Sequence, residues 1–283
     1  MSRVAIVTDS ASDLPPEAAA AAGIDIVPLI VNFGSDTFKS GVDLTTDEFW
    51  RRMTAPDAPF PTTAASSPGD FKAAYDRCFA EGADAIVSIH VAGTLSGTIK
   101  SAEIAREMVH EGDIHIVDSG SASMGEGLLA LLASEMGAQG SGAAEIARVL
   151  EARKSNLDLY VALDTLEYLR KGGRISGAQA AIGTLLSVKP IITIREGLVH
   201  TADKPRTRGK ARERVFELLL QKPIERLAVL FTPPADGEGF RREILARLGA
   251  AIDPRNVSIQ PVGPSVGPHL GPGCVGGVVL YAE

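Results

Sequence analysis

The chain has 283 residues, of which 45% are hydrophobic and only 5% aromatic, a composition ordinary for an α/β protein with one large or two medium domains. Its formal net charge of −7 excludes the broadly basic surface by which proteins bind nucleic acid or an anionic membrane. The longest cationic cluster, DKPRTRGKARERV at residues 203–215, is local and interrupted by acids, so it leaves room only for a localised partner site.

The amino-terminal stretch, the lengths of the apolar segments and the cysteines favour a cytoplasmic protein over a secreted or membrane-spanning one. In MSRVAIVTDS the apolar run has four residues before Thr8, too few for the hydrophobic region of a signal peptide. No segment reaches the roughly 20 apolar residues that cross a bilayer. Cys78 and Cys274 have no CxxC spacing, and we interpret both as reduced packing residues. We therefore expect a cytoplasmic protein without an integral membrane segment.

The first half alternates short apolar runs with longer helical patterns. The Val/Ile-rich runs lie at residues 3–10, 84–91 and 114–119, and helical patterns follow at 15–23, 97–109 and 125–139. Continuous β-branched runs, each followed by a helix, are typical of parallel strands in βαβ units. The sequence therefore predicts an open, mostly parallel sheet with flanking helices in the N-terminal half.

Two polar segments of this half attract a functional interpretation. Residues 55–71, APDAPFPTTAASSPGDF, are expected to form a long loop, and loops of that length are often functional. Asp9 and Asp13 in VTDSASD are close enough in sequence to suggest a metal or acid–base site. Strand-end acids commonly cap the following helix, and we favour that interpretation. Asp13 is the expected capping acid because Pro15 and Pro16 suit a first helical turn.

The pattern changes near residue 155. A β run at 157–163 is followed by a short helix, a Gly-Gly turn, and strands joined by a tight turn at Glu196-Gly197. Two further βα-like pieces complete the chain. We therefore predict an α/β fold with two domains, residues 1–155 and 156–283.

The turn in IHVAGTLSGTIKSA, residues 89–102, consists almost wholly of small residues and hydroxyls. Ligands of open α/β sheets collect at the carboxyl ends of strands, where helix N-termini present free N–H groups. Ser96 can donate a hydrogen bond there and Gly97 lets a ligand approach the backbone, so a carboxylate or phosphate is the matched guest. A plain helix N-cap at Ser96 or Thr98 explains the same residues.

Spacing excludes two other sites at this turn. A P-loop needs GxxxxGK[ST], but Gly93 and Gly97 lie too close together and Thr98 stands where lysine is required. A nucleophile elbow needs GxSxG, whereas threonines stand two residues on either side of Ser96.

Together with other motifs, this turn resembles the DegV family of fatty-acid-binding proteins, which are bacterial two-domain α/β proteins. The motifs are, in chain order, VTDSASDLP, TTAASSPGDF, LSGT, VDSGSASMGEG, DTLEYLRKGGRIS, LLSVKPIITIREG, KPRTRGKA and GPHLGPGCVG. The resemblance covers essentially the whole chain, and the joint presence of LSGT, DTLEYLxKGGRIS and HxGPG is far more specific than any one motif. It implies one fatty acid buried between two domains.

The resemblance also implies which residues hold the carboxylate: Thr63 from a TSQPS-like loop and Ser96 from LSGT. In this chain the loop reads TAASS at residues 63–67, and Ala92-Gly93 replaces the serine pair that usually precedes xLSGT. The two hydroxyls are retained while the polar network around them is thinner than the family pattern.

His269 in GPHLGPG and Arg174 in GGRIS match two further family positions near the carboxylate. A histidine can donate a hydrogen bond to a carboxylate in either protonation state. A lone histidine between glycines is otherwise often structural, and an arginine after a Gly-Gly turn can tie loops together by a salt bridge. The other four histidines show no metal-ligand spacing, so no metal site is predicted.

Members of the family resemble carriers that present the fatty acid to a separate kinase, which phosphorylates the carboxylate to an acyl phosphate. Burial of about 14 methylenes at roughly 0.8 kcal/mol each supplies about 11 kcal/mol of gross driving force, and binding requires neither a catalytic side chain nor a cofactor. The carrier then contributes orientation. Transient contact with a membrane is compatible with this role.

A kinase contact is implied at Arg206, because Lys204-Pro205-Arg206-Thr207 reproduces the family's KxRT segment, whose arginine lies on the surface that meets the kinase. The alternative interpretation of this segment is a solvated charged surface.

Two other functions stay open. A stand-alone serine-dependent acyl hydrolase, or a phosphotransferase, using Ser96 with His269 would need a third orienting group and an oxyanion hole, and no spacing identifies either. A sensor or transport protein for another amphiphilic anion is the second alternative.

Overall fold

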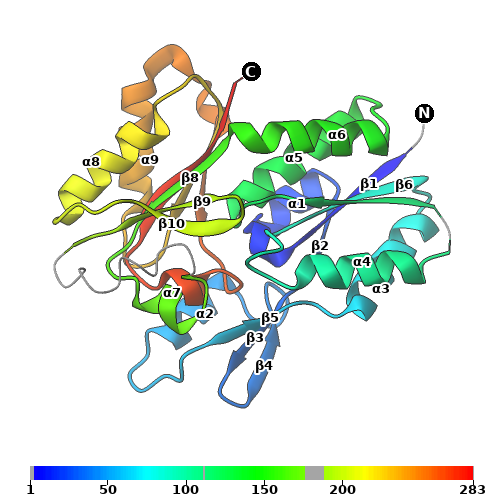
Figure 1. The fold of residues 1–283 in the computed structure, drawn as a ribbon, viewed down its shortest axis with the longest axis horizontal. Helices are drawn as coiled ribbons and strands as arrows, with labels where there is room; N and C mark the ends of the chain where they lie inside the picture. The colour runs from blue at the N-terminus through cyan, green and yellow to red at the C-terminus, as the bar shows by residue number, and fades with distance from the viewer. Residues whose placement is uncertain (1–2, 111, 176–187, 283) are drawn as a thin grey trace.

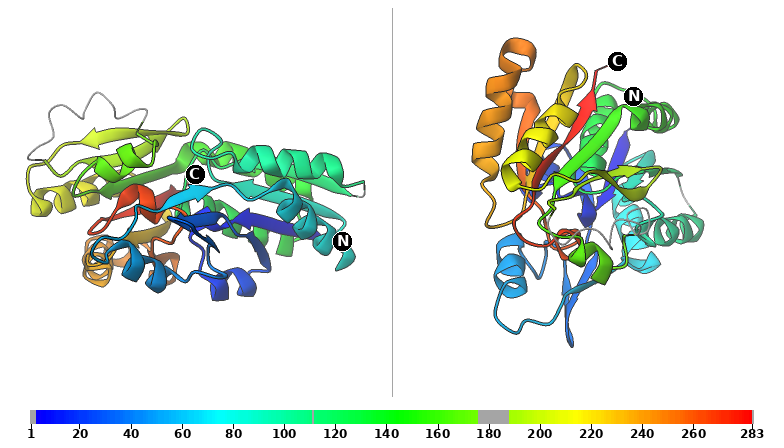
Figure 2. Two further views of the ribbon diagram at one scale, coloured as in Figure 1. Left: turned by 90° about the horizontal axis from the view of Figure 1, so that it is seen from below. Right: turned by 60° about the vertical axis from the view of Figure 1, so that its left-hand side comes forward.

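The computed structural model describes residues 3–110, 112–175 and 188–282. Within them, two large sheets lie side by side along the molecule and a small third sheet projects from one side (Figures 1 and 2). The first half of the chain builds one large sheet and the second half builds the other.

The first sheet has four parallel strands in the order β2-β1-β6-β7. Its strands are β1 (Val4–Asp9), β2 (Ile24–Val27), β6 (Ala85–His90) and β7 (Asp113–Asp118). Its helices are α1 (Pro16–Ala21), α3 (Pro68–Ala80), α4 (Thr98–Met108), α5 (Met124–Ala138) and α6 (Ala143–Arg153). Strand β6 is buried at every position because α3 and α4 cover one face of the sheet while α1, α5 and α6 cover the other. The predicted parallel sheet with flanking helices is confirmed.

The second sheet has six strands in the order β10-β9-β8-β13-β11-β12 and is mixed, with only β11 and β12 parallel. Its strands are β8 (Leu157–Ala162), β9 (Ile191–Arg195), β10 (Leu198–Asp203), β11 (Ile224–Phe231), β12 (Val257–Pro261) and β13 (Val275–Tyr281). Helices α8 (Arg208–Leu219) and α9 (Gly237–Leu248) cover one face. The short helices α7 (Glu167–Lys171) and α10 (Gly267–Leu270) pack against each other. The tight turn predicted at Glu196-Gly197 joins β9 to β10, and both residues have positive φ.

The third sheet was not predicted. It consists of β3 (Ile30–Phe33), β4 (Asp36–Lys39) and β5 (Thr62–Ala64), all antiparallel, beside helix α2 (Thr46–Met53). The prediction of a loop over residues 55–71 is therefore wrong at β5 and at the start of α3. A three-residue strand carries no readable periodicity, and its pairing with β3 sets its conformation. Ser67 and Asp70 form a capping box that begins α3 at Pro68.

Asp13 does not cap the first helix, so that prediction is wrong. Helix α1 begins after Pro15 without a side-chain cap. Asp13 instead ends the 3-10 turn η1 (Ser10–Ser12) with a φ of 53°, and its carboxylate accepts hydrogen bonds from Ser123 Oγ and the Gly263 backbone N–H. Tertiary donors outcompete the local cap. Asp9 does behave as expected of a strand-end acid, since it caps η1 by accepting from the Ala11 N–H at 2.8 Å.

One apolar core joins the two large sheets through α5, which runs between them (Figure 1). It includes Ile6 of β1, Leu128 of α5, and Leu159 and Val278 of the second sheet. The change of sheet falls at η2 (Lys154–Asn156), next to the predicted boundary, but the shared core means that the division into domains 1–155 and 156–283 stays a prediction. Cys78 and Cys274 are buried and free, as expected.

Candidate functional site

A cavity lies between the carboxyl ends of β1 and β6 and the inner face of the second sheet. Its empty volume is about 720 Å³, part of which is open to solvent. Both halves of the chain supply its apolar wall, which includes Val91, Ala122, Leu159, Val161, Ile192 and Leu230. Its polar lining consists of Thr63, Ser96, Ser123, Arg174, Ser265 and His269. Thus all four predicted side chains, Thr63, Ser96, Arg174 and His269, line the same cavity.

Thr63 and His269 meet across this cavity. Thr63 is placed by the pairing of β5 with β3, and its Oγ1 lies 3.2 Å from Nε2 of His269 on α10. Burial, reinforced by the nearby Arg174 charge, lowers the pKa of His269 to about 4. The imidazole is therefore neutral near pH 7. Its Nδ1 is buried without a hydrogen-bond partner among the described residues, whereas its Nε2 faces the Thr63 hydroxyl.

Ser96 stands at the N-terminus of α4, but it is not the N-cap. That position belongs to Gly97, which makes no side-chain cap bond. Ser96 Oγ lies 2.7 Å from Thr98 Oγ1 and accepts a hydrogen bond from the Thr98 backbone N–H at 3.3 Å. The N-cap interpretation is therefore wrong for Thr98, which is the first residue of α4, whereas the Ser96 hydroxyl does satisfy a first-turn N–H from one residue before the N-cap position. Gly97 itself is not among the cavity-lining residues, so its predicted role in binding stays a prediction.

Arg174 ties two loops together through backbone carbonyls. Its Nε donates to Leu95 O at 3.1 Å and its Nη1 donates to Gly172 O at 2.6 Å. Within the described part of the chain it forms no ion pair, so the salt-bridge alternative is wrong there. Because no carboxylate of residues 3–110, 112–175 or 188–282 pairs with it, the guanidinium brings positive charge to the end of the cavity where the hydroxyls and His269 lie.

Arg206 lies apart from the cavity. It is exposed on the segment between β10 and α8, where Thr207 caps α8 and the Pro205 carbonyl accepts from the Lys189 N–H at 2.6 Å. Its expected contact with a kinase stays a prediction. Ser176 of the DTLEYLRKGGRIS motif and residues 185–187 lie outside the described residues.

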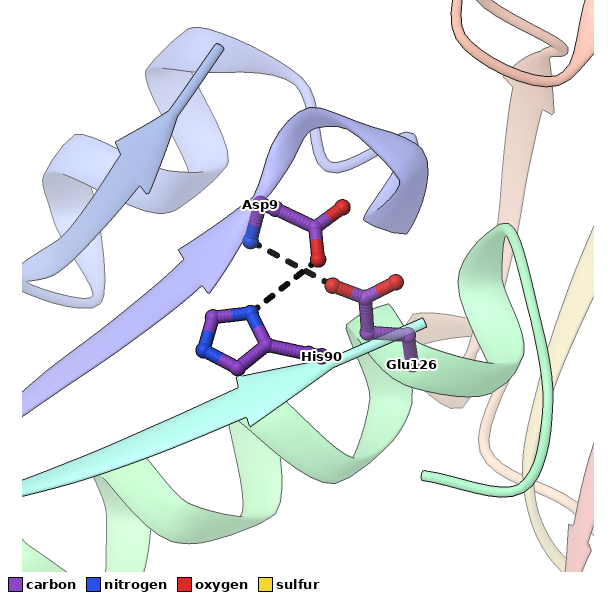
Figure 3. Close-up of side chains that lie close together, drawn as sticks. All are labelled: Asp9, His90 and Glu126. Atoms are coloured by element: carbon purple, nitrogen blue, oxygen red, sulfur yellow. Dashed lines mark hydrogen bonds and ion pairs between the residues drawn. The ribbon is translucent and has the colours of Figure 1, made fainter. Parts of the chain in front are cut away.

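A second polar cluster was missed from the sequence and consists of Asp9, His90 and Glu126 (Figure 3). Asp9, His90 and Glu126 are all fully buried, and one potential ligand atom from each lies within 4.8 Å of the others. Asp9 and His90 end the adjacent parallel strands β1 and β6, a relation that the strand pattern could have signalled. Glu126 is in the first turn of α5; it falls within the VDSGSASMGEG motif, but that motif did not indicate its burial or its approach to Asp9.

The fold and this site define a class of α/β protein in which an apolar cavity ends in hydroxyl, imidazole and guanidinium groups. The family model described as "Uncharacterised protein, DegV family" matches residues 3–282, and the chain belongs to the DegV family. A DegV domain-containing protein of Deinococcus radiodurans is 36% identical over 277 residues, covering 96% of each chain.

Solved structures of this family share the whole architecture. A DegV family protein from Thermus thermophilus, described by its fatty acid binding, has 34% identity and a TM-score of 0.90 over 99% of this chain and 100% of its own. DegV from Bacillus subtilis, described as a fatty acid binding protein, has 32% identity and a TM-score of 0.86, with 99% of both chains covered. A stearic-acid-binding protein from Eubacterium ventriosum has 28% identity and a TM-score of 0.86, with 99% of this chain and 98% of its own covered.

No helix in the described parts of the chain combines the length and apolar character needed to cross a bilayer.

Proposed function

We propose that this protein binds one long-chain fatty acid in the cavity and presents its carboxylate to a separate kinase, which converts it to an acyl phosphate. The observation that carries the proposal is the make-up of the cavity, whose long apolar wall ends in Thr63, Ser96, Arg174 and His269. The fatty acid binding described for the Thermus and Bacillus relatives supports the same ligand class.

The contribution of each part follows from its chemistry. The apolar wall supplies the driving force, at roughly 0.8 kcal/mol for each buried methylene. The Thr63 and Ser96 hydroxyls and a neutral His269 Nε2–H act as donors, each worth about 1.5–3 kcal/mol toward a charged acceptor. Arg174 adds a positive field beside the carboxylate without leaving its own carbonyl partners. Together these four side chains recognise an anion through three hydrogen-bond donors and one fixed positive charge.

The kinase step needs only orientation from this chain. The sequence has no P-loop, and the proposal assigns nucleotide binding and phosphoryl transfer to the partner. Holding one carboxylate oxygen by hydrogen bonds leaves the other free to attack the nucleotide's terminal phosphate. Exposed Arg206 is the proposed contact with the kinase.

The hydrolase alternative finds less support in the geometry. Within the described residues Ser96 is hydrogen-bonded to Thr98 and not to His269, whose Nε2 faces Thr63. A nucleophilic serine requires a base within hydrogen-bond reach. Acyl release from an ester by the purified protein alone would nevertheless favour that alternative over carriage.

Native mass spectrometry and fluorescent fatty-acid binding test the proposal together. We expect the purified protein to carry one long-chain fatty acid. The double variant Thr63→Val/Ser96→Ala should lose about 2–4 kcal/mol of binding free energy. Thr62→Val is the matched control, because Thr62 is exposed on the same strand as the half-buried Thr63. An unchanged affinity in the double variant would place the carboxylate elsewhere, and a different copurified anion would favour the sensor or transport alternative.

A further inference from the structure

The buried cluster of Asp9, His90 and Glu126 lies beside the cavity and is not part of its lining. Each of the three side chains has 0% exposure. Figure 3 shows the Glu126 carboxylate next to that of Asp9, with the His90 ring also directed at Asp9. Two carboxylates removed from water require compensation, because burial of an unpaired charge is strongly unfavourable.

Asp9 has that compensation. Its Oδ1 accepts from the Ala11 N–H at 2.8 Å, and its Oδ2 accepts from the Val91 N–H at 3.3 Å. Oδ2 also lies 3.1 Å from His90 Nδ1. Hydrogen bonds of this kind stabilise the charged form of a carboxylate. Asp9 is therefore the member of the pair equipped to carry the negative charge.

Glu126 lacks comparable compensation. Its Oε1 accepts from Thr8 Oγ1 at 2.7 Å and from the Asp9 N–H at 3.3 Å, while its buried Oε2 has no partner among the described residues. In that part of the chain no lysine or arginine bonds either carboxylate. Burial, and then repulsion by Asp9, raise the pKa of Glu126 well above its usual value.

His90 faces Asp9 and a chain of hydroxyls, and it makes no hydrogen bond to Glu126 among the described residues. Tyr75 Oη donates to Ser88 Oγ at 2.9 Å, and Ser88 Oγ lies 2.7 Å from His90 Nε2. The other ring nitrogen, Nδ1, lies 3.1 Å from Asp9 Oδ2. His90 therefore compensates Asp9 and leaves Glu126 Oε2 without a partner among those residues.

We propose that Asp9 and Glu126 share one buried proton, and that this proton holds the cavity wall in its lipid-binding form. The link to the wall is short and consists of two hydrogen bonds and one stretch of backbone. Ala11 and Val91, whose N–H groups Asp9 holds, both line the cavity. Ser123, which precedes the helical turn that carries Glu126, lines it as well. Loss of the proton places two like charges against each other and strains these connections.

This inference rests on the proposed lipid-binding function, and it makes lipid affinity depend on pH. If the cavity binds lipid only while the pair retains its proton, affinity falls by about tenfold for each pH unit above the ionisation of Glu126. Other titratable groups lie close to the pair of carboxyls, Asp9 and Glu126. They are His90 on β6, Tyr75 on α3 and Asp13 at the end of η1, which is electrostatically coupled to Asp9.

Glu126→Gln isolates the shared proton from those groups. Glutamine keeps the shape and an acceptor for Thr8, remains neutral at every pH, and offers an amide N–H to Asp9. Glu135→Gln is the matched control because Glu135 is exposed on the same helix, away from the cluster. We expect the affinity of Glu126→Gln to stay flat across the alkaline range in which the affinities of wild type and Glu135→Gln decline.

Infrared spectroscopy tests the proton directly. Asp13, the other buried acid, has a pKa of about 7 and would add a band of its own, so every protein in this test carries Asp13→Asn. In deuterated buffer near neutral pH, Asp13→Asn and Asp13→Asn/Glu135→Gln should show the carbonyl stretch of a protonated, buried carboxylic acid, and Asp13→Asn/Glu126→Gln should lack it. If the Glu126→Gln variant does not fold, the band of Asp13→Asn suffices: bound lipid should shift its titration to higher pH, by reciprocity of linkage, and an unshifted titration overturns the coupling.

Three results distinguish failure of the shared proton, failure of its link to the cavity and failure of the proposed function. Absence of the band, or a stoichiometric divalent metal in the purified protein, overturns the shared proton. Equal alkaline loss of affinity in wild type and Glu126→Gln overturns its link to the cavity. Absence of lipid binding at every pH in a protein that shows the band overturns the proposed function while leaving the shared proton standing.

Discussion

Replacing Asp13 by asparagine should stabilise the protein at neutral and alkaline pH and change little at acidic pH. Burial raises the pKa of Asp13 from 3.8 to about 7. Between these values the folded protein holds a proton that the unfolded chain has lost, so the free energy of unfolding falls as pH rises. Above about pH 7 the full penalty applies. A shift of about three pKa units corresponds to an upper limit of about 4 kcal/mol.

Asparagine suits this position for two further reasons. It tolerates the left-handed backbone of Asp13, whose φ is 53°. Its amide can also replace both interactions, accepting from the Gly263 N–H and donating to Ser123 Oγ. The contact with Gly263 connects the first half of the chain to the loop after β12, so the variant keeps the two halves joined.

Urea unfolding at about pH 5 and about pH 8 measures the effect. The gain of Asp13→Asn over wild type should be larger by a few kcal/mol at the higher pH. Asp57→Asn is the control, because Asp57 also has a positive φ, of 58°, but is exposed. A gain that is equal at both pH values, or one reproduced by Asp57→Asn, would refute the reasoning from burial.

Three other variants probe the lipid site and the kinase contact. Arg206→Ala should retain its lipid in native mass spectrometry but sharply slow acyl-phosphate formation with the cognate kinase; a wild-type rate at every carrier concentration excludes Arg206 from the productive interface. Gly172→Ala places a methyl group 2.1 Å from His269 Nδ1, so it should displace the imidazole and weaken lipid binding roughly tenfold, or about 1.4 kcal/mol. The control is Gly209→Ala, at a position with open space, which should leave lipid binding unchanged. Thr94→Val removes a hydroxyl that donates to the Gly197 carbonyl in the β9–β10 turn and should speed lipid release in stopped-flow displacement. Thr94→Ser keeps a hydroxyl and should release lipid at the slow rate of wild type. Equal release rates in the two variants would contradict this role for the hydroxyl.

The parallel sheet could be predicted because its strands are covered on both faces. Strand β6 is buried at every position, and a continuous apolar run followed by a helix has few other interpretations. The third sheet could not be predicted in this way. Strand β5 has three residues, two of them exposed, and it owes its existence to pairing with β3. Its placement of Thr63 is therefore a tertiary effect.

For the polar residues of the cavity, too, the sequence predicted their positions but not their contacts. Thr63, Ser96, Arg174 and His269 were identified through motifs spread along the chain, and the structure brings all four to one cavity. The hydrogen-bond partners of these residues could not be predicted from the sequence. Arg174 donates to backbone carbonyl oxygens and not to an acid, because its partners are set by how two loops pack against each other.

Glu126 shows why buried acids escape sequence analysis. It lies within GEGLLALL, where an acid reads as an exposed helix residue, yet its side chain is fully buried against Asp9 from 117 positions earlier. That burial becomes tolerable only if one of the two carboxyls is neutral. The local pattern predicts the opposite exposure, and only the approach of α5 to β1 reveals the conflict.

The two polar clusters impose related electrostatic demands on the cavity. Arg174 carries a positive charge at the end where the proposed carboxylate would bind, while the buried carboxyl groups of Asp9 and Glu126 lie behind the wall. A negative charge on each of them would oppose an anionic ligand across a region of low dielectric constant, where Coulomb interactions are strong. A proton on Glu126 removes that opposition. The same proton that makes two buried acids compatible with the fold therefore also favours a cavity that accepts an anion.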